Sequence, residues 1–419
     1  VLARFALAKI GAVMVAANTR YKTAEIGYIL RQSDSTTLLM MDRFLNIDYL
    51  AMLDAICPEL ATSTPGRLHS ARLPLLRNVV LRTTDHVPGA LRWADLLELG
   101  TYAGAADDVR RAQAAVGPED IADLIYTSGT TGFPKGAMCA HGQILQSAFN
   151  SGERQRFTDR DRLLVPTPLF HIFGCLNALL APLTHGAAIV LLETFEAGEA
   201  LAALREQRCT AMYGTPTMFI AVLDHPDFSK VDTSAMRTGI IGGAPVPLAL
   251  MQAIVEKMGA REMTIGYGMT ESSAVITQTP CDAPIELRVT TVGPAMPDVE
   301  IKIVDPRSGA DQPHGEQGEI CFRGYTVMKG YYKMPAETAK AIDQDGWMHT
   351  GDLGVMQPNG YLNITGRLKD MYISGGFNVY PVEIEEVLFA HPKVKSAYVV
   401  GVPDQRMGEL GLAVIELRE

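Results

Sequence analysis

The chain has 419 residues, of which 47% are apolar and 20% are charged, and its formal net charge is −10 at pH 7. This length exceeds what one hydrophobic core usually supports, so we expect two or more domains of an ordinary globular protein. The negative charge and the lack of a basic cluster exclude nucleic acid as the principal partner.

The N-terminal part predicts alternating helices and strands. Residues 1–17 form an amphipathic pattern that runs into an apolar strand, and because the first residue is not Met we expect residues to be missing upstream. The helical pattern of residues 23–32 is followed by the apolar residues 37–41, and this alternation up to about residue 80 favours a parallel sheet with helices on its faces. Residues 81–118 contain several Gly and Pro breakers and predict a less regular excursion.

Residues 126–136, Tyr-Thr-Ser-Gly-Thr-Thr-Gly-Phe-Pro-Lys-Gly, directly follow the strand-like residues 121–125. Glycines let backbone N–H groups converge, hydroxyls donate further hydrogen bonds, and Lys135 adds a positive charge. The segment therefore predicts a polyphosphate-binding loop. It does not have the Walker spacing, because Gly136 follows the lysine instead of Ser or Thr. Taken alone, it could also be a surface turn.

Four further apolar strands are predicted at residues 162–165, 187–192, 211–213 and 238–241, each followed by a turn with Gly or Pro. Ligands of an open α/β sheet bind outside the carboxyl ends of its strands, so these turns indicate one crevice. His171 follows the first of these strands among aromatic and aliphatic residues. It is either a hydrogen-bonded core residue or a gate on an apolar pocket.

Residues 267–271, Tyr-Gly-Met-Thr-Glu, offer an aromatic face, a hydroxyl and a carboxylate in one short stretch. A nucleotide base could stack on Tyr267 while Glu271 binds Mg²⁺. The same stretch could equally be a polar turn.

From about residue 291, short alternating strands predict an antiparallel meander or small barrel. Within it, Asp352 follows a tight turn, where its carboxylate could accept two hydrogen bonds from a ribose diol or merely cap the turn. Residues 366–370 form a charged connection to the glycine turn at 374–378, which as a bare pattern is usually a solvated linker. The remaining helix and strands begin a second α+β unit that stops unfinished.

Together these stretches resemble the adenylate-forming superfamily, which includes acyl-CoA synthetases, aryl-CoA ligases, luciferases and the adenylation domains of peptide synthetases. The resemblance covers nearly the whole chain, and its motifs occur in the expected order at residues 126–136, 166–174, 242–245, 267–271, 318–324, 350–353 and 366–385. It implies an α/β fold of two α/β subdomains with parallel-rich sheets (1–290) plus a small β-barrel (291–366), followed by an incomplete α+β C-terminal domain (367–419).

The resemblance also implies a role for each site residue. The expected ligands are Thr127, Ser128, Gly129, Thr130, Thr131, Gly132 and Lys135 for the ATP phosphates; Gly243, Ala244, Tyr267 and Gly268 for adenine; Thr270 and Glu271 for the α-phosphate and Mg²⁺; Asp352 and Arg367 for the ribose; Lys369 for the hinge of the C-terminal domain; and Gly375 and Gly376 for the pantetheine arm of coenzyme A. Lys135, Thr270, Glu271 and His171 are the expected catalytic residues.

The implied activity is that of an ATP-dependent acid–thiol ligase. A carboxylate is a weak nucleophile with a poor leaving group, so ATP converts it to an acyl-adenylate with release of pyrophosphate, and coenzyme A then gives acyl-CoA and AMP. Mg²⁺, a lysine and hydroxyl donors suit the charge that gathers at the α-phosphate. The expected small molecules are thus a carboxylic acid, ATP, Mg²⁺ and coenzyme A.

Residues 366–385 look most like those of ligases for medium-chain fatty acids and for alicyclic acids, so the resemblance implies an acid of one of these kinds. Residues 265–276 carry Met269 and small side chains, which predicts an apolar pocket without a fixed charge. Peptide-synthetase domains hold the substrate amine with an aspartate near residues 170–173, where this chain has no acid. The alternatives are another adenylate-forming enzyme, for amino-acid adenylation or of the luciferase type, or a non-catalytic protein that binds nucleotide or acyl groups.

One feature departs from the resemblance. The family's adenylation lysine lies in a motif near the C-terminus, and this chain ends before any such motif. We therefore expect the 419-residue chain to bind ATP and acid but to adenylate slowly. Lys135 is the lysine of the phosphate loop and is not assumed to replace it.

The cysteines and the apolar runs indicate a location. Six cysteines are scattered without a Cys-x-x-Cys pair, which is typical of reduced thiols in a cytoplasmic protein and argues against a zinc site. No segment has 18 consecutive apolar residues, so we expect no integral membrane span. The sequence leaves open whether the chain forms a homodimer.

Overall fold

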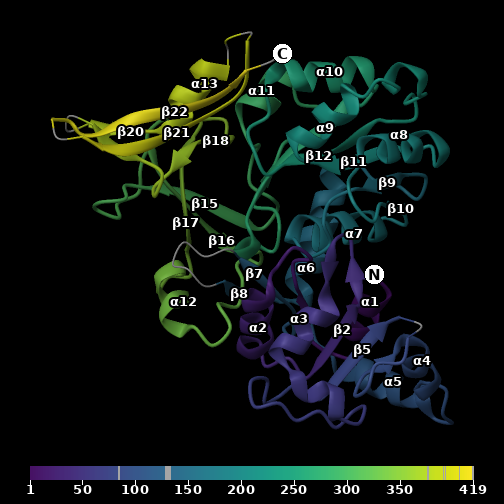
Figure 1. Ribbon diagram of the computed structural model, residues 1–419. Coiled ribbons are helices and arrows are strands. Elements are labelled where there is room, and N and C mark those ends of the chain that lie inside the picture. The colour runs from purple at the N-terminus through teal and green to yellow at the C-terminus, as the bar shows by residue number, and fades with distance from the viewer. Residues whose placement is uncertain are drawn as a thin grey trace. The chain divides into compact units, whose positions relative to one another are not determined.

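The computed structural model describes residues 1–83, 85–127, 134–374, 377–389, 391, 393–404 and 406–417. The chain divides into two compact units, each made of segments that are distant in the sequence; Figure 1 labels their elements. Unit 1 comprises Val1–Gln146, Pro168–Asn177 and Met328–Thr338, and unit 2 comprises Ser147–Thr167, Ala178–Val327 and Ala339–Glu419. The three expected domain ranges remain a prediction.

Unit 1 contains two three-stranded sheets and the helices that accompany them. In the first sheet β1 pairs in parallel with β7, which pairs antiparallel with β8. In the second sheet β2, β5 and β6 run parallel. The elements are α1 (Leu2–Lys9), β1 (Met14–Ala16), α2 (Thr23–Gln32), β2 (Thr37–Met41), β3 (Arg43–Phe44), β4 (Ile47–Asp48), α3 (Tyr49–Ile56), β5 (Asn78–Arg82), β6 (Leu91–Arg92), α4 (Trp93–Leu99), α5 (Ala105–Ala115), β7 (Ile121–Thr127) and β8 (Lys135–Ala140).

Helix α2 forms where the sequence predicted it, and local chemistry explains why. Glu25 accepts a hydrogen bond from the backbone N–H of Lys22 at 2.7 Å, which caps the first turn. Ile29 and Leu30 are buried on the inner face of the helix, and Leu30 packs with Leu53 in the apolar core of the unit. Capping and an apolar face together stabilise the helix against the second sheet.

Residues 81–118 are more regular than the sequence predicted. Helices α4 and α5 lie in this segment, and Gly104 adopts a φ of 96° directly before α5. Neither helix has a buried residue, and Val109 is the one apolar residue of α5 larger than alanine. The segment also carries the breakers Pro88-Gly89, Gly104 and Gly117-Pro118, which favour loops.

Unit 2 is built on a six-stranded sheet of order β10-β9-β11-β12-β13-β14, in which the first five strands run parallel and β14 is antiparallel. Because β9 borders β10 on one side and β11 on the other, a topological switch point lies at the carboxyl ends of β9 and β11. Buried residues of the accompanying helices form one core with the sheet. The elements are β9 (Arg162–Val165), α7 (Leu179–Leu183), β10 (Ala188–Leu191), α8 (Ala197–Glu206), β11 (Ala211–Gly214), α9 (Pro216–Leu223), β12 (Thr238–Gly242), α10 (Leu248–Lys257), β13 (Glu262–Tyr267), β14 (Thr277–Gln278) and α11 (Ile285–Thr290).

Two antiparallel sheets complete unit 2. The first is a meander in which β15, β16, β17 and β18 lie in chain order, as the alternating pattern predicted, and the second has the order β20-β19-β22-β21. Their strands, and the helices not yet named, are α6 (His141–Arg154), β15 (Val299–Val304), β16 (Gln317–Gly324), α12 (Pro335–Ala341), β17 (Met348–Met356), β18 (Leu362–Arg367), β19 (Tyr372–Ser374), β20 (Phe377–Val379), α13 (Pro381–Phe389), β21 (Val394–Asp404) and β22 (Gly408–Leu417). Helices α6 and α12 pass from one unit into the other.

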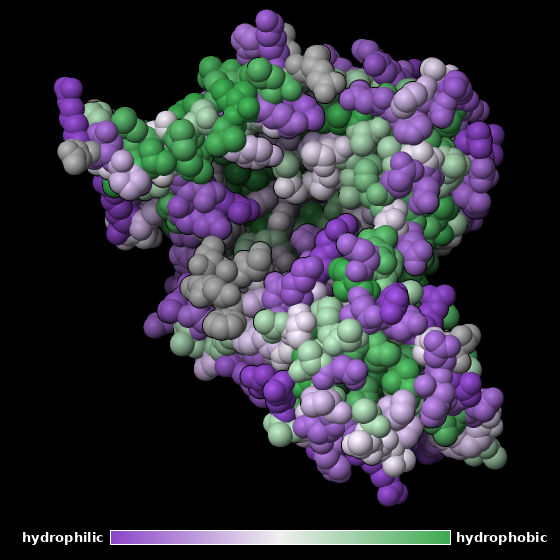
Figure 2. Space-filling model, in the orientation of Figure 1, coloured by the Kyte–Doolittle hydropathy of each residue, from purple (hydrophilic) through white to green (hydrophobic). Residues whose placement is uncertain are grey.

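The hairpin of β21 and β22 is longer than the sequence predicted, and one of its faces is apolar. The cross-strand pairs Tyr398–Val414 and Val400–Leu412 lie on that face, and each of these side chains is at least 50% exposed. Figure 2 shows apolar side chains gathered over these strands.

Candidate active site

The predicted phosphate loop connects two paired strands of unit 1. Strand β7 ends at Thr127 and β8 begins at Lys135, and these two residues face each other in the antiparallel ladder. The structure thus describes both ends of the loop. Five of the expected ligands, Ser128, Gly129, Thr130, Thr131 and Gly132, lie outside the described residues.

Lys135 is held by two partners from the segment that lies beside β8. Its Nζ atom lies 4.3 Å from the ring centroid of Tyr331 and 3.6 Å from a carboxylate oxygen of Glu337. Tyr331 reaches this place because it forms a bridge with Ala137 of β8. Such contacts are weak individually, so a phosphate could draw the ammonium group away from them.

His171 lies in unit 1 next to a π-helix, Phe173–Ala178. Its Nδ1 accepts a hydrogen bond from the backbone N–H of Phe173 at 3.3 Å. The ring reaches the surface, yet the surrounding protein lowers the pKa of the imidazole by desolvation. His171 is therefore a neutral side chain near pH 7, which suits the rim of an apolar pocket better than a charged group would.

In unit 2, Asp352 connects two of the predicted nucleotide residues. The hydroxyl of Tyr267, at the end of β13, donates to Asp352 Oδ2 at 2.8 Å, and Nε of Arg367 lies 2.9 Å from Asp352 Oδ1. Asp352 and Arg367 are cross-strand partners of β17 and β18. The structure therefore brings together three residues that the sequence separates by as many as 100 positions.

Burial governs the protonation of this trio. Asp352 is 8% exposed, and desolvation raises the pKa of its carboxyl, although the hydrogen bond from Tyr267 and the charge of Arg367 oppose the rise. Burial and the neighbouring carboxylate raise the pKa of Tyr267 well above its usual value, so its hydroxyl stays protonated and donates.

The predicted adenine residues lie at the carboxyl ends of two adjacent parallel strands. Gly242 of β12 pairs with Gly266 of β13, so Gly243 and Ala244 follow one strand where Tyr267 and Gly268 end the other. Gly243 adopts a φ of 85°, which favours glycine. A Cβ atom on Gly268 would lie 1.9 Å from the carbonyl oxygen of Ala274. Two glycines are thus required by the backbone itself.

Thr270 and Glu271 begin a short 3-10 helix and are both buried. The two residues that follow the helix, Ser273 and Ala274, adopt positive φ angles of 51° and 98°. Such angles are rare for residues with a side chain and persist only where the surroundings enforce them. The hydroxyl and carboxylate oxygens of Thr270 and Glu271 are hard ligands of the kind that Mg²⁺ prefers.

Lys369 is exposed in the turn between β18 and β19, at the connection between the two antiparallel sheets of unit 2. Gly375 and Gly376, the expected pantetheine ligands, lie outside the described residues. Of the predicted site residues, Thr127, Lys135 and His171 belong to unit 1, and the other described ones belong to unit 2.

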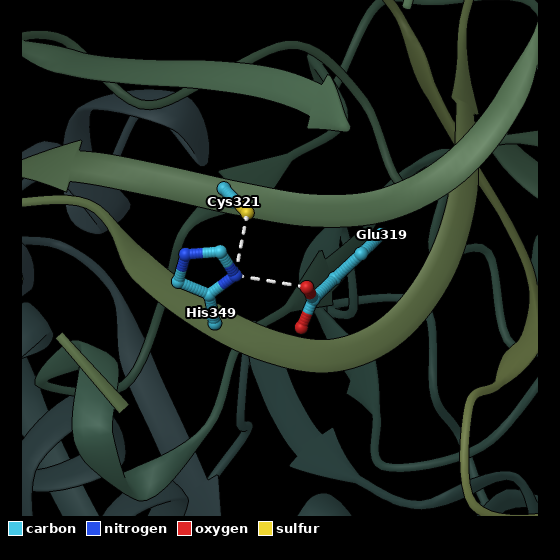
Figure 3. A group of neighbouring side chains, drawn as sticks. All are labelled: Glu319, Cys321 and His349. Carbon is cyan, nitrogen blue, oxygen red and sulfur yellow. Dashed lines mark hydrogen bonds and ion pairs between the residues drawn. The ribbon is translucent and has the colours of Figure 1, made fainter. Parts of the chain in front are cut away.

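One cluster beside Asp352 was missed by sequence reasoning (Figure 3). Nδ1 of His349 lies 2.8 Å from Glu319 Oε2 and 3.4 Å from Cys321 Sγ. These three side chains come from the neighbouring strands β16 and β17, so only their pairing brings them together. Among the described residues, this is the single group of three His, Cys or acidic side chains close enough to share a metal ion.

The contacts of the cluster favour a structural role over a metal site. Burial and the charge of Glu319 raise the pKa of the Cys321 thiol to about 12, so the sulfur stays protonated at neutral pH. The carboxylate of Glu319 already accepts hydrogen bonds through both oxygens, from His349 and from the backbone N–H of Gly351 at 3.0 Å.

Among the described residues, no helix has the length and apolar character needed to cross a membrane.

Comparisons with known proteins agree along the whole chain. Residues 1–332 match the family described as AMP-binding enzyme, and residues 383–419 match the AMP-binding enzyme C-terminal domain. The acyl-CoA synthetase YngI of Bacillus subtilis is 44% identical over 99% of this chain and 76% of its own length. The bovine mitochondrial medium-chain acyl-CoA ligase ACSF2 is 38% identical over 100% of this chain and 69% of its own length.

Solved structures show the same fold. ATP-bound MatB from Rhodopseudomonas palustris superposes with a TM-score of 0.80 at 30% identity, over 98% of this chain and 75% of MatB. The anthranilate CoA ligase AuaEII in complex with anthranoyl-AMP superposes with a TM-score of 0.81 at 28% identity, over 99% of this chain and 74% of AuaEII. The mixed α/β fold that the sequence predicted is thus confirmed.

Proposed function

This chain belongs to the AMP-binding enzyme family and is an AMP-forming acyl-CoA ligase that binds ATP, and from that premise we propose that it joins a medium-chain fatty acid or an alicyclic acid to coenzyme A. The observation that carries the nucleotide part of the proposal is the position of Asp352 between Tyr267 and Arg367. Asp352 is a buried carboxylate in contact with Tyr267, which ends the parallel strand β13, and this arrangement suits the ribose of a bound nucleoside.

We assign the other nucleotide contacts by the chemistry of the residues. Gly243 and Ala244 leave the carboxyl end of β12 without large side chains, so an adenine ring could lie there against Tyr267. Lys135 and Thr127 would bind the terminal phosphates with the intervening loop. The weak contacts of Lys135 with Tyr331 and Glu337 support this role, because they hold the ammonium group in place without trapping it.

Thr270 and Glu271 would hold Mg²⁺ next to the α-phosphate. A buried carboxylate would repel a phosphate unless a cation lay between them, and the residues present match the oxygen ligands that Mg²⁺ takes. Bound Mg²⁺ would neutralise charge at the reacting phosphate.

The reaction needs no nucleophile from the protein. A carboxylate oxygen of the acid attacks the α-phosphorus of ATP, and the bond to the bridging oxygen of pyrophosphate breaks. The thiolate of coenzyme A then attacks the acyl carbonyl, and AMP leaves with the shared oxygen. The protein would contribute orientation and charge stabilisation at the α-phosphate, to which we assign donors such as Thr270.

The choice of acid rests on the relatives and on the apolar character of the expected pocket. ACSF2 is named for medium-chain acids, and residues 269–275 of this chain carry one Met and several small side chains. His171, neutral at pH 7, adds no charge that would bind an amino group or a second carboxylate. The six cysteines are buried and form no disulfide, which supports a reducing compartment such as the cytoplasm.

A panel of acids tests the proposal. Octanoate, cyclohexanecarboxylate, benzoate, anthranilate and phenylalanine are each supplied with Mg-ATP and coenzyme A, and thioester and AMP are measured together. We expect the first two acids to give equal amounts of acyl-CoA and AMP. A protein that reacts only with aryl acids or amino acids contradicts the assignment of the substrate. Pyrophosphate release without thioester, at saturating coenzyme A, contradicts the assignment of the acceptor.

A further inference from the structure

Strand β17 makes a bulge that contains Asp352, the carboxylate proposed to bind the ribose. Glu319 of β16 pairs with Leu353 and Cys321 pairs with His349, so residues 350–352 of β17 lie opposite the single residue Ile320. Gly351, at the centre of the bulge, adopts a φ of 72°. A bulge of this kind redirects the side chains that it carries, and here the last residue of the bulge is Asp352.

Side chains from β16 and from the bulge itself fix its shape. Glu319 accepts the backbone N–H of Gly351 through Oε1 at 3.0 Å and faces Nδ1 of His349 through Oε2 at 2.8 Å (Figure 3). The hydroxyl of Thr350 donates to the carbonyl of Ile320 at 2.8 Å and accepts the N–H of Asp352 at 3.0 Å. These bonds replace the ladder bonds that the bulge interrupts.

The burial of Glu319 makes it the strongest of these supports. Its side chain is 11% exposed, and both of its oxygens are used on residues at or next to the bulge. Hydrogen bonds to a buried carboxylate are stronger than bonds between neutral groups and are costly to lose. Loss of the carboxylate would leave the N–H of Gly351 without its acceptor, while the carbonyl of Gly351 would still accept the N–H of Leu368 at 2.9 Å.

We propose that Glu319 is a positioning residue for nucleotide binding, which fixes the bulge of β17 so that Asp352 meets the ribose hydroxyls. This inference rests on the proposed role of Asp352. Glu319 itself touches no nucleotide; it acts through Gly351 and His349. Its effect should therefore be confined to ligands that carry the ribose diol.

The test compares ATP with 2′,3′-dideoxyATP, which lacks both ribose hydroxyls. Dissociation constants of the two Mg²⁺ complexes are measured by calorimetry for the wild type and for Glu319→Gln, Glu319→Ala and Asp352→Asn. The readout is the ratio of the two constants, which a change in the fraction of folded protein does not move. Glu300→Gln is the matched control, because Glu300 is a carboxylate of the same sheet that pairs with Arg323 at the surface.

We expect Asp352→Asn to reduce the preference for ATP about tenfold, which corresponds to the loss of a charge-assisted hydrogen bond. Glu319→Ala should reduce it nearly as much, Glu319→Gln less, since an amide can still accept the N–H of Gly351, and Glu300→Gln not at all. The double variant Glu319→Ala with Asp352→Asn should lose no more than Asp352→Asn alone, because both changes act through one contact.

Two failures are distinguishable. An unchanged preference in Asp352→Asn overturns the role of Asp352 and with it this inference. A lost preference in Asp352→Asn that both Glu319 variants retain overturns the inference alone. The variant Cys321→Ser separates a metal site from a positioning network. It should keep the wild-type preference for ATP, with or without added Zn²⁺. If added Zn²⁺ changes the preference of the wild type but not that of Cys321→Ser, the cluster binds metal instead.

Discussion

At the scale of single residues, Asp352 shows how opposing electrostatic effects set one protonation state. Desolvation disfavours its charged form, whereas Tyr267 and Arg367 stabilise it, and desolvation is the larger effect. The pKa of the Asp352 carboxyl therefore lies above that of an exposed aspartate, which is about 3.9. If Asp352 accepts hydrogen bonds from the ribose, as we propose, binding of a nucleoside should follow this titration.

The first prediction concerns pH. The affinity for adenosine, which has no phosphate to titrate, should fall as the pH drops through the raised pKa of Asp352, because the protonated carboxyl loses an acceptor and its ion pair with Arg367. In Asp352→Asn the affinity should be weaker and flat over that range. Calorimetric titrations from about pH 4 to 7 check this. Parallel loss of affinity in both proteins would assign the titration to another group.

The same residue shows what a sequence can predict about a site. Asp352, Tyr267 and Arg367 belong to short motifs whose residue types suggest nucleotide chemistry, and the structure brings them together. Glu319 lies in the motif at residues 318–324, but its contact with His349 and with the bulge depends on the register of two strands, so the motif alone assigned it no role. The register of a strand pair depends on tertiary packing and cannot be predicted from either strand alone.

At the scale of elements, the first helix illustrates a contact that connects distant segments. Arg4 interrupts the apolar N-terminal stretch, and in α1 it is buried and forms a two-pronged ion pair with Asp123 of β7, at 2.7 and 3.0 Å. The side chains are 8% and 1% exposed. The sequence predicted a helix here, but a partner 119 residues away could not be found from the helical pattern.

The second prediction tests this pair. Arg4→Met should destabilise unit 1 by about 3–5 kcal/mol, because it leaves a buried carboxylate without its partner, whereas the double variant Arg4→Met with Asp123→Leu should recover most of the loss. Urea unfolding is followed by the fluorescence of Trp93 in unit 1, in a Trp347→Phe background, since the chain has two tryptophans.

The control for this prediction is an ion pair of the same kind at the surface. Arg110 and Asp107 of α5 pair with side chains more than 60% exposed, so Arg110→Met should change the unfolding midpoint little. Equal losses in Arg4→Met and in the double variant would show that the arginine stabilises the helix through packing of its stem and not through its charge.

At the scale of the whole molecule, the order of the elements was predicted better than their extent. Alternating patterns indicated the parallel sheets and the antiparallel meander, and the structure contains both. Helices α4 and α5 were not predicted because Gly and Pro breakers surround them and α5 has few large apolar residues. The hairpin of β21 and β22 runs past its predicted ends through residues such as Pro403, Asp404 and Gly408, which are uncommon in strands. Periodicity is informative only where one face is buried and the other is not.

The last prediction concerns the turn at Lys369, which the family resemblance makes the hinge between the two half-reactions. The turn is exposed and joins β18 to β19, so a change of its backbone angles could reorient the C-terminal sheet without breaking the core of either antiparallel sheet. Lys369→Pro fixes one of these angles and restricts the preceding residue. We expect thioester formation to fall at least about tenfold while formation of the acyl-adenylate changes less than about twofold.

The two half-reactions are measured separately, as pyrophosphate release without coenzyme A and as transfer of preformed acyl-adenylate to coenzyme A. Lys369→Ala is the matched control, because it removes the same charge and leaves the backbone free to rotate. If Lys369→Ala slows the transfer as much as Lys369→Pro, the lysine acts through its charge. If Lys369→Pro slows both half-reactions equally, the turn is not a hinge between them, and the conformational change must lie elsewhere in the chain.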